Sequence, residues 1–144
     1  MLYRHCINFF ILYLNNSVSS MKIINLVVFL SLLVFTPNCL ADAELAKGKS
    51  IYNGIGACAA CHGDKGLGDG AAAAALNPKP RSFAAGEYKY DTDKDGKAGT
   101  EKDIYNIVTN GAAKYGGSVL MAARADIPEA DRKALAKYVL SLKK

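Results

Sequence analysis

Five consecutive residues, Cys58 to His62, constrain this chain more than any other stretch. Two cysteines three positions apart, with a histidine directly after the second, form the attachment sequence of a c-type haem. The spacing follows from the chemistry, because the two thiols must reach the two vinyl groups on one porphyrin edge while the imidazole ligates the iron. A chance match or a redox-active dithiol is the alternative. The motif predicts one covalent haem bound by Cys58, Cys61 and His62.

The beginning of the chain is typical of a targeting segment. Lys22 precedes an apolar run over residues 23–35, and Cys39-Leu40-Ala41 then lead into a polar stretch. This order of charged, apolar and small residues predicts a secretory signal peptide that is cleaved after Ala41. The apolar run is shorter than the roughly 20 residues that a membrane span needs. An uncleaved anchor, or a lipid on Cys39, is the less favoured alternative.

A second apolar stretch, residues 7–14, stands ahead of a signal that is already complete from Met21. We therefore hypothesise that translation starts at Met21. The expected organisation is a signal-peptide region over 1–41 and one folded domain over 42–144.

Removal of this region changes the inventory of reactive side chains. Cys58 and Cys61 become the remaining cysteines, His62 the remaining histidine and Met121 the remaining methionine. The formal net charge falls from +5 to +3, which indicates a solvated surface rather than a nucleic-acid or membrane footprint. We expect no stable membrane insertion after cleavage. The mature part has no tryptophan, so a buried macrocycle would supply much of its apolar core.

Apolar periodicity predicts helices at both ends of the mature part. The first helix is expected over residues 43–53, with Asp42 as its N-cap and Gly48 as a point of close helix contact. The last helix is expected after Pro128, and its apolar face should cross the first helix at Gly48 and Tyr52. That face consists of Leu135, Tyr138, Val139 and Leu142.

A third helix is expected between these two. Thr100 and Asp103 have the spacing of a capping box, and an apolar stripe at Ile104, Ile107 and Val108 follows them. Asn110-Gly111 should end this helix.

Three loop segments have chemical interest. A carbonyl in the rigid stretch 77–80 could accept the Nδ1 proton of His62, although its prolines could equally form only a turn. The acidic segment 91–96 starts like a calcium loop but has Lys102 where a bidentate carboxylate is needed, so a solvated loop is favoured. A cationic and aromatic cluster could meet haem propionates, or could be ordinary surface. Its members are Arg81, Phe83, Tyr88 and Tyr90.

The sixth position of a haem iron bound by His62 has one leading candidate. Met121 is the only thioether left after cleavage and lies on a loop that begins with two glycines. A lone methionine is usually core filler, and a lysine, a tyrosine or an open site are the alternatives. Ligation by His62 and Met121 would raise the reduction potential relative to ligation by two imidazoles. It would also leave no vacant position on the iron, which suits electron transfer.

The chain resembles a class I c-type cytochrome in four features. These are the motif at 58–62, the preceding helix with Gly48 and Tyr52, the loop with Met121, and the last helix. The resemblance implies an all-α cytochrome c fold, with three to five helices wrapped around one covalently attached haem and crossed terminal helices. It also implies an exposed haem edge through which single electrons pass. One departure is Ala122-Ala123 after Met121, where many relatives have a proline.

The resemblance further implies a periplasmic single-electron carrier rather than an enzyme, monomeric or weakly dimeric, with redox proteins as donor and acceptor. The alternatives are an electron-transfer subunit of a larger oxidoreductase, and a haem enzyme or gas sensor with a labile Met121. A thiol-disulfide oxidoreductase is disfavoured because no βαβ pattern surrounds Cys58 and Cys61.

Overall fold

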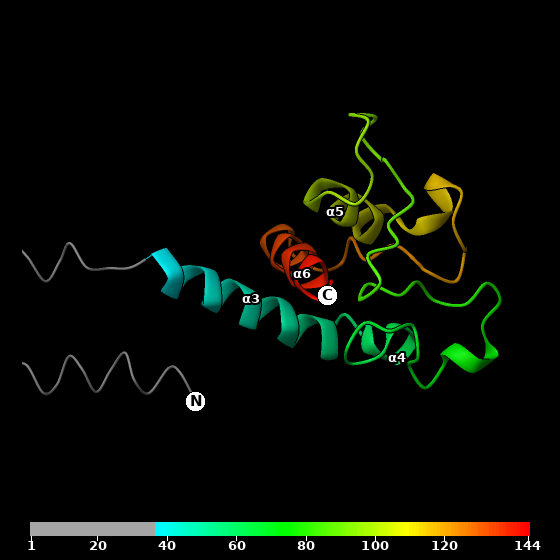
Figure 1. Ribbon diagram of the computed structural model, residues 1–144, viewed down its shortest axis with the longest axis horizontal. Coiled ribbons are helices and arrows are strands. Elements are labelled where there is room, and N and C mark those ends of the chain that lie inside the picture. The colour runs from blue at the N-terminus through cyan, green and yellow to red at the C-terminus, as the bar shows by residue number, and fades with distance from the viewer. Residues whose placement is uncertain (1–36) are drawn as a thin grey trace, which may run out of the picture. The chain divides into compact units, whose positions relative to one another are not determined.

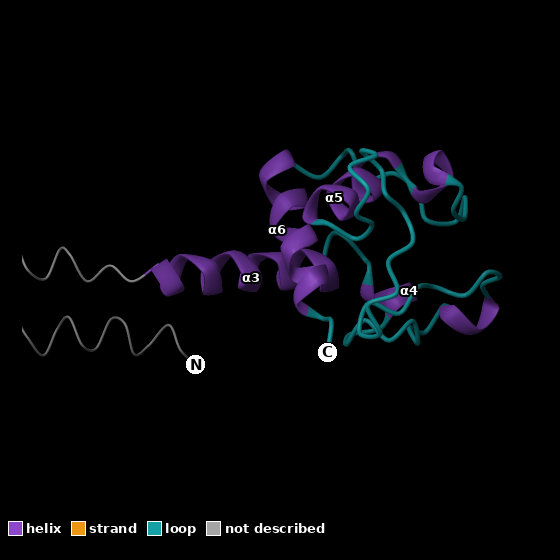
Figure 2. Cartoon of the chain, turned by 45° about the horizontal axis from the view of Figure 1, so that its top comes forward, coloured by secondary structure: helices purple, strands orange, loops and turns teal. Residues whose placement is uncertain are grey.

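The computed structural model describes residues 37–144, which form helices joined by long loops, without a strand in this range (Figure 2). The predicted all-α class is confirmed. No helix within these residues has both the length and the apolar character that crossing a membrane requires. The elements follow in the order α3 (Pro37–Asn53), α4 (Ala59–His62), η2 (Ala73–Ala75), α5 (Glu101–Asn110), η3 (Ala112–Tyr115) and α6 (Glu129–Ser141).

Helices α3 and α6 cross at Gly48, as predicted (Figure 1). A Cβ atom at Gly48 would come within 2.6 Å of Cβ of Tyr138 and would also meet the carbonyl oxygen of Ala134. One turn further along α3, the ring of Tyr52 packs edge to face on the ring of Tyr138, with centroids 5.3 Å apart. The missing side chain at Gly48 therefore allows the two backbones to approach closely.

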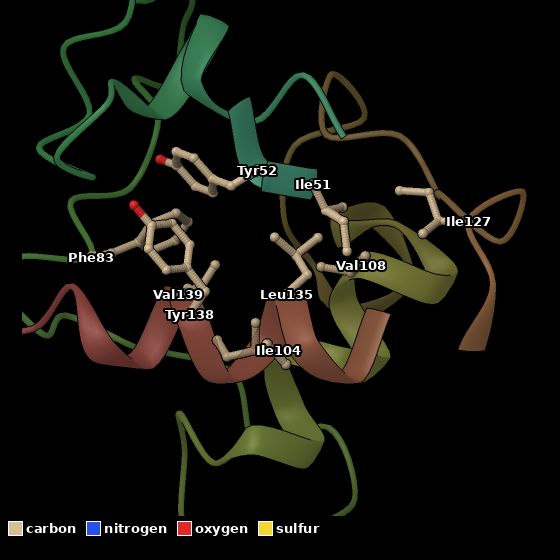
Figure 3. Close-up of a cluster of buried hydrophobic side chains, with 10 residues drawn as sticks. Ile51, Tyr52, Phe83, Ile104, Val108, Ile127, Leu135, Tyr138 and Val139 are labelled. Atoms are coloured by element: carbon tan, nitrogen blue, oxygen red, sulfur yellow. The ribbon is translucent and has the colours of Figure 1, made fainter. Parts of the chain in front are cut away.

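The hydrophobic core lies where α3, α5 and α6 meet (Figure 3). The predicted apolar face of α6 is buried, and Leu142, one residue beyond the end of α6, packs against it. The core side chains are Ile51, Tyr52, Phe83, Ile104, Val108, Ile127, Leu135, Ala136, Tyr138 and Val139.

Helix α5 begins at the predicted capping box. Thr100 accepts a hydrogen bond from the backbone N–H of Asp103, and the Asp103 carboxylate accepts one from the backbone N–H of Thr100 at 2.9 Å. Asp103 has no exposed surface and also accepts hydrogen bonds from the N–H and Oγ1 of Thr92, at 2.6 and 2.8 Å. It therefore anchors the preceding loop as well as the helix, and Gly111 ends the helix as predicted.

The predicted start of the first helix is wrong. Helix α3 begins at Pro37 rather than at residue 43, so Asp42 lies inside the helix and does not cap it. Proline is tolerated at a first helical position because the N–H that it lacks would have no partner there. The expected cleavage point after Ala41 also falls within α3, while the rest of the predicted signal region, residues 1–36, lies outside the described residues.

The acidic segment 91–96 forms a turn that its own side chains close. The Asp91 carboxylate accepts hydrogen bonds from the backbone N–H groups of Asp95 and Gly96, at 3.1 and 2.8 Å. Carboxylate oxygens of Asp91, Asp93 and Asp95 lie within 4.8 Å of one another. The hydrogen bonds from the backbone to Asp91 are enough to explain the shape of this turn. A solvated loop is therefore still the favoured interpretation.

Candidate functional site

The predicted attachment motif folds as a tight turn followed by the short helix α4. The backbone N–H of Gly56 donates to the carbonyl of Ile51 at 2.8 Å, and that of Cys58 donates to the carbonyl of Tyr52 at 2.9 Å. Tyr52 also donates its hydroxyl proton to the carbonyl of Gly63 at 2.7 Å, and burial raises the pKa of Tyr52 so that it stays a donor. The end of α3 therefore fixes both ends of α4.

The glycine-rich loop after His62 folds back and caps the short helix. Backbone N–H groups of Gly68, Gly70 and Ala72 donate to the carbonyls of His62, Cys61 and Ala60, at 2.8, 3.1 and 2.9 Å. These carbonyls would otherwise lack partners at the end of a helix. The loop thus holds the motif in place through backbone hydrogen bonds.

His62 is buried and held in one tautomer. Its Nδ1 lies 3.0 Å from the carbonyl oxygen of Arg81, which can only accept a hydrogen bond. Burial lowers the pKa of His62, so the imidazole is neutral, with its proton on Nδ1 and a free lone pair on Nε2. The acceptor is therefore one residue beyond the predicted stretch 77–80. A carbonyl partner of this kind orients a ligating histidine and raises its basicity.

The cationic and aromatic cluster assembles beside His62. The Phe83 ring stacks on the imidazole of His62, with centroids 4.3 Å apart and planes 19° apart, and Tyr88 stacks on Phe83 at 6.3 Å. The guanidinium of Arg81 lies 6.0 Å from the centroid of Tyr90. The four residues are thus neighbours in space, with Arg81 as their cation.

The two cysteines of the motif are half-buried and are not joined in a disulfide. Burial raises the pKa of the Cys58 thiol to about 11, so this thiol is protonated at neutral pH. A redox-active dithiol instead needs a thiolate with a lowered pKa. The environment of Cys58 therefore opposes thiol-disulfide exchange.

Both cysteines, His62 and Met121 line one cavity of about 600 Å³. This volume is within the range of about 300 to 1,000 Å³ that is typical of cofactor sites. Apolar side chains such as Leu76, Val108 and Leu135 form much of its wall. The dimensions, the pair of thiols and the free Nε2 fit a covalently attached haem.

A smaller apolar recess of about 80 Å³ adjoins this cavity and shares His62 and Met121 with it. Arg81 and Lys89 are the cations that line both spaces. Two cations that line both the cavity and its apolar recess suit anionic groups on a ligand. The predicted meeting of Arg81 with haem propionates stays a prediction.

Sequence reasoning missed the role of Arg124. Its Nη1 donates to the carbonyl of Gly56 at 2.9 Å and its Nη2 to the carbonyl of Ile55 at 2.7 Å, across 68 and 69 positions of the chain. Only its position three residues after Met121 would have drawn attention to this arginine. It joins the Met121 loop to the turn before Cys58.

Comparisons with known proteins show what the chain as a whole is similar to. The sequence model of the family described as cytochrome c matches residues 45–143. A chain of the reducing HAO-like protein complex of Kuenenia stuttgartiensis has a similar structure, with a TM-score of 0.57 and 28% sequence identity. That match covers 71% of this chain and 44% of the other, so this chain spans less than half of its structural relative. Curated protein sequences contain no match.

Proposed function

Because this chain belongs to the cytochrome c family, whose members transfer electrons through haem, we propose that it is a periplasmic single-electron carrier with one haem. The observation that carries the proposal is the cavity that Cys58, Cys61, His62 and Met121 line together. The bound haem would supply an iron that cycles between the ferrous and ferric states.

The residues around the cavity have separate roles in this proposal. Cys58 and Cys61 would hold the group by thioether bonds, and His62 would ligate the iron through Nε2. The Arg81 carbonyl keeps the proton of His62 on Nδ1 and so keeps Nε2 available. Met121 would supply a second protein ligand to the iron, which would leave no position for small molecules and would favour the reduced state.

The folded domain in this proposal starts at Asp42, after cleavage of the signal peptide. Several contacts that hold α3 to α6 lie beyond this point. They include the ion pairs of Lys47 with Asp131 at 2.5 Å and of Lys137 with Glu44 at 2.7 Å. A mature chain that begins at Asp42 therefore keeps the helix crossing at Gly48.

A second candidate function is an electron-transfer subunit of a larger oxidoreductase. It is favoured because the structural relative belongs to a complex and is more than twice as long as the matched region. The chemistry at the cavity would be unchanged, but the exposed surface would have a permanent partner. Purification at a fixed stoichiometry with another chain would favour this function over a free carrier.

The full chain should be produced in a bacterial host that attaches haem in its periplasm. We expect an intact mass equal to residues 42–144 plus one haem, no titratable thiols, and a reduced spectrum with a sharp c-type α band. Two free thiols with no α band would overturn the haem assignment. Carbon monoxide binding to the ferrous protein at neutral pH would instead favour a haem enzyme or gas sensor.

A further inference from the structure

The segment that carries Met121 has little side-chain packing of its own. Val119 and Leu120 are 77% and 60% exposed, and Ala122 and Ala123 after Met121 are exposed as well. Packing therefore does not fix this loop, and no proline stiffens it after Met121. Something else must hold the thioether at the cavity.

Backbone hydrogen bonds tie one side of the loop to the end of α5 and to the start of η3. The N–H of Ala112 donates to the carbonyl of Met121 at 3.0 Å, and the N–H of Arg124 donates to the carbonyl of Val108 at 2.8 Å. Gly111 allows this approach, because it has a φ of +80° and a Cβ there would lie 3.2 Å from the Met121 carbonyl oxygen. These bonds connect the loop to α5, but not to the segment that carries Cys58 and His62.

The side chain of Arg124 makes that second connection. Its two hydrogen bonds reach the carbonyls of Ile55 and Gly56, in the turn that leads directly into Cys58. The Gly56 carbonyl also lies 3.6 Å from Sγ of Cys58. One guanidinium thus links the loop of Met121 to the turn before the attachment cysteines.

Asp126 orients the guanidinium from the other side. Its carboxylate accepts hydrogen bonds from Nε and Nη2 of Arg124, both at 2.9 Å. The Asp126 side chain is 62% exposed, so water and salt screen this ion pair, which should contribute little by itself. The bonds from Arg124 to the two carbonyls are therefore the contacts that span the site.

We propose that Arg124 is a positioning residue that keeps Met121 at the axial position by clamping its loop to the turn before Cys58. This inference rests on the proposed ligation by His62 and Met121. Without the clamp, the loop would open more often, and the population with Met121 away from the iron would rise. A lysine would keep the charge, but it lacks the planar fork that reaches two successive carbonyls and a carboxylate together.

The test uses the complete protein with its haem attached. Imidazole is titrated into the ferric form, since it competes with Met121 for the iron. The apparent affinity for imidazole scales with the fraction of molecules in the open state. The charge-transfer band between thioether sulfur and ferric iron reports Met121 ligation directly. Both are measured for the wild type, Arg124→Lys and Arg124→Gln.

We expect imidazole to bind at least about tenfold more tightly to both variants, because each loses one or both of the charge-assisted bonds to the two carbonyls, and loss of one such bond shifts an equilibrium by about that factor. The charge-transfer band should weaken in parallel. Asp126→Asn, which leaves both carbonyl bonds in place, should change the affinity by less than about twofold. Thr100→Ala removes the N-cap of α5 and serves as a destabilised control, with unchanged imidazole affinity.

Two outcomes would overturn the inference, and they are distinguishable. If the wild type lacks the charge-transfer band, ligation by Met121 is wrong and the clamp has no ligand to position. If the band is present but Arg124→Lys binds imidazole like the wild type, ligation stands and the clamp is wrong. An equal gain in affinity for Thr100→Ala would show general destabilisation and would also overturn it.

Discussion

His62 and Met121 line the same cavity, but the chain holds them in different ways. His62 is 8% exposed, is hydrogen-bonded to the Arg81 carbonyl and is stacked on Phe83. Met121 is half-buried between exposed neighbours, and its loop depends on backbone hydrogen bonds and on Arg124. The histidine side is fixed by packing and local capping, whereas the methionine side is fixed by a few long-range bonds. The two sides should therefore fail differently when they are disturbed.

Removal of each proposed ligand, His62 or Met121, should give the largest contrast between the two sides. We expect His62→Ala to abolish recovery of a haem protein, because attachment relies on the motif at 58–62. Met121→Ala should retain covalent haem and a folded chain, but should lower the reduction potential and bind carbon monoxide stoichiometrically. Mass spectrometry, redox titration and carbon monoxide difference spectra measure these effects. Equal loss of haem in both variants would contradict the asymmetry.

Loss of the Phe83 ring, which stacks on His62, should have the second largest effect. Phe83 is 8% exposed, and its truncation in Phe83→Ala should lower the free energy of unfolding by about 3–5 kcal/mol. Phe83→Leu keeps most of the buried volume and should cost less than about 1.5 kcal/mol. Guanidinium denaturation of the haem-loaded protein measures both. Leu67→Ala, at a side chain that is 45% exposed, is the control and should cost far less than Phe83→Ala.

Substitution of Asp103 should disturb the histidine side indirectly. Asp103 anchors the loop that carries Tyr88, and Tyr88 stacks on Phe83 beside His62. Despite the opposing effect of burial, hydrogen bonds from Thr92 and Thr100 hold the pKa of Asp103 below its ordinary value. Asp103→Asn replaces this acceptor and should lower the free energy of unfolding by about 1.5–3 kcal/mol at pH 7. Asp95→Asn, at an exposed acid of the same loop, should change it by no more than about 0.5 kcal/mol.

The lowered pKa of Asp103 also determines how the stability difference between the wild type and Asp103→Asn changes with pH. A carboxyl with a lowered pKa in the folded state stabilises the fold above the pKa of the unfolded chain, about 3.9. This contribution disappears as the pH falls through the lower, folded-state pKa. The stability difference between wild type and Asp103→Asn should therefore shrink on acidification below about pH 4. A difference that grows with acid would contradict the network around Asp103.

The features predicted correctly from sequence are mostly local. The capping box of Thr100 and Asp103 and the end of α5 at Gly111 depend on residues close together in the chain. The helix crossing at Gly48 was also predictable, because a glycine inside an apolar helical face indicates close packing. Such patterns carry their physical cause in the sequence itself.

The long-range contacts of the site could not be predicted from the pattern of residue types in the sequence. The clamp from Arg124 to Ile55 and Gly56 uses backbone carbonyls as acceptors, and any residue type supplies those. The acceptor for His62 was misplaced by one residue for the same reason, since a carbonyl is not visible as a residue type. Asp103 was predicted as half of a cap, but its bonds to Thr92 depend on how the preceding loop folds back.

The smallest expected effect concerns the turn before Cys58. Ala57 has a φ of +50°, in the left-handed region that costs an ordinary residue about 1–2 kcal/mol. Ala57→Gly relieves this strain but also makes the unfolded chain more flexible, which offsets about 0.4–1 kcal/mol. A gain in stability of no more than about 1 kcal/mol should result, whereas Ala57→Val should lose stability, because a β-branched residue is poorly tolerated at positive φ.

Denaturation and the yield of attached haem, measured together, show what the strain at Ala57 does. The backbone N–H groups of Ala57 and Cys58 donate to the carbonyls of Gly54 and Tyr52, both at 2.9 Å, and these bonds hold the turn against the strain. If hydrogen bonds alone set the turn, Ala57→Gly should attach haem as well as the wild type. If haem attachment fell in Ala57→Gly despite unchanged stability, the histidine side would depend on a stiff backbone at Ala57 and not only on its hydrogen bonds and packing.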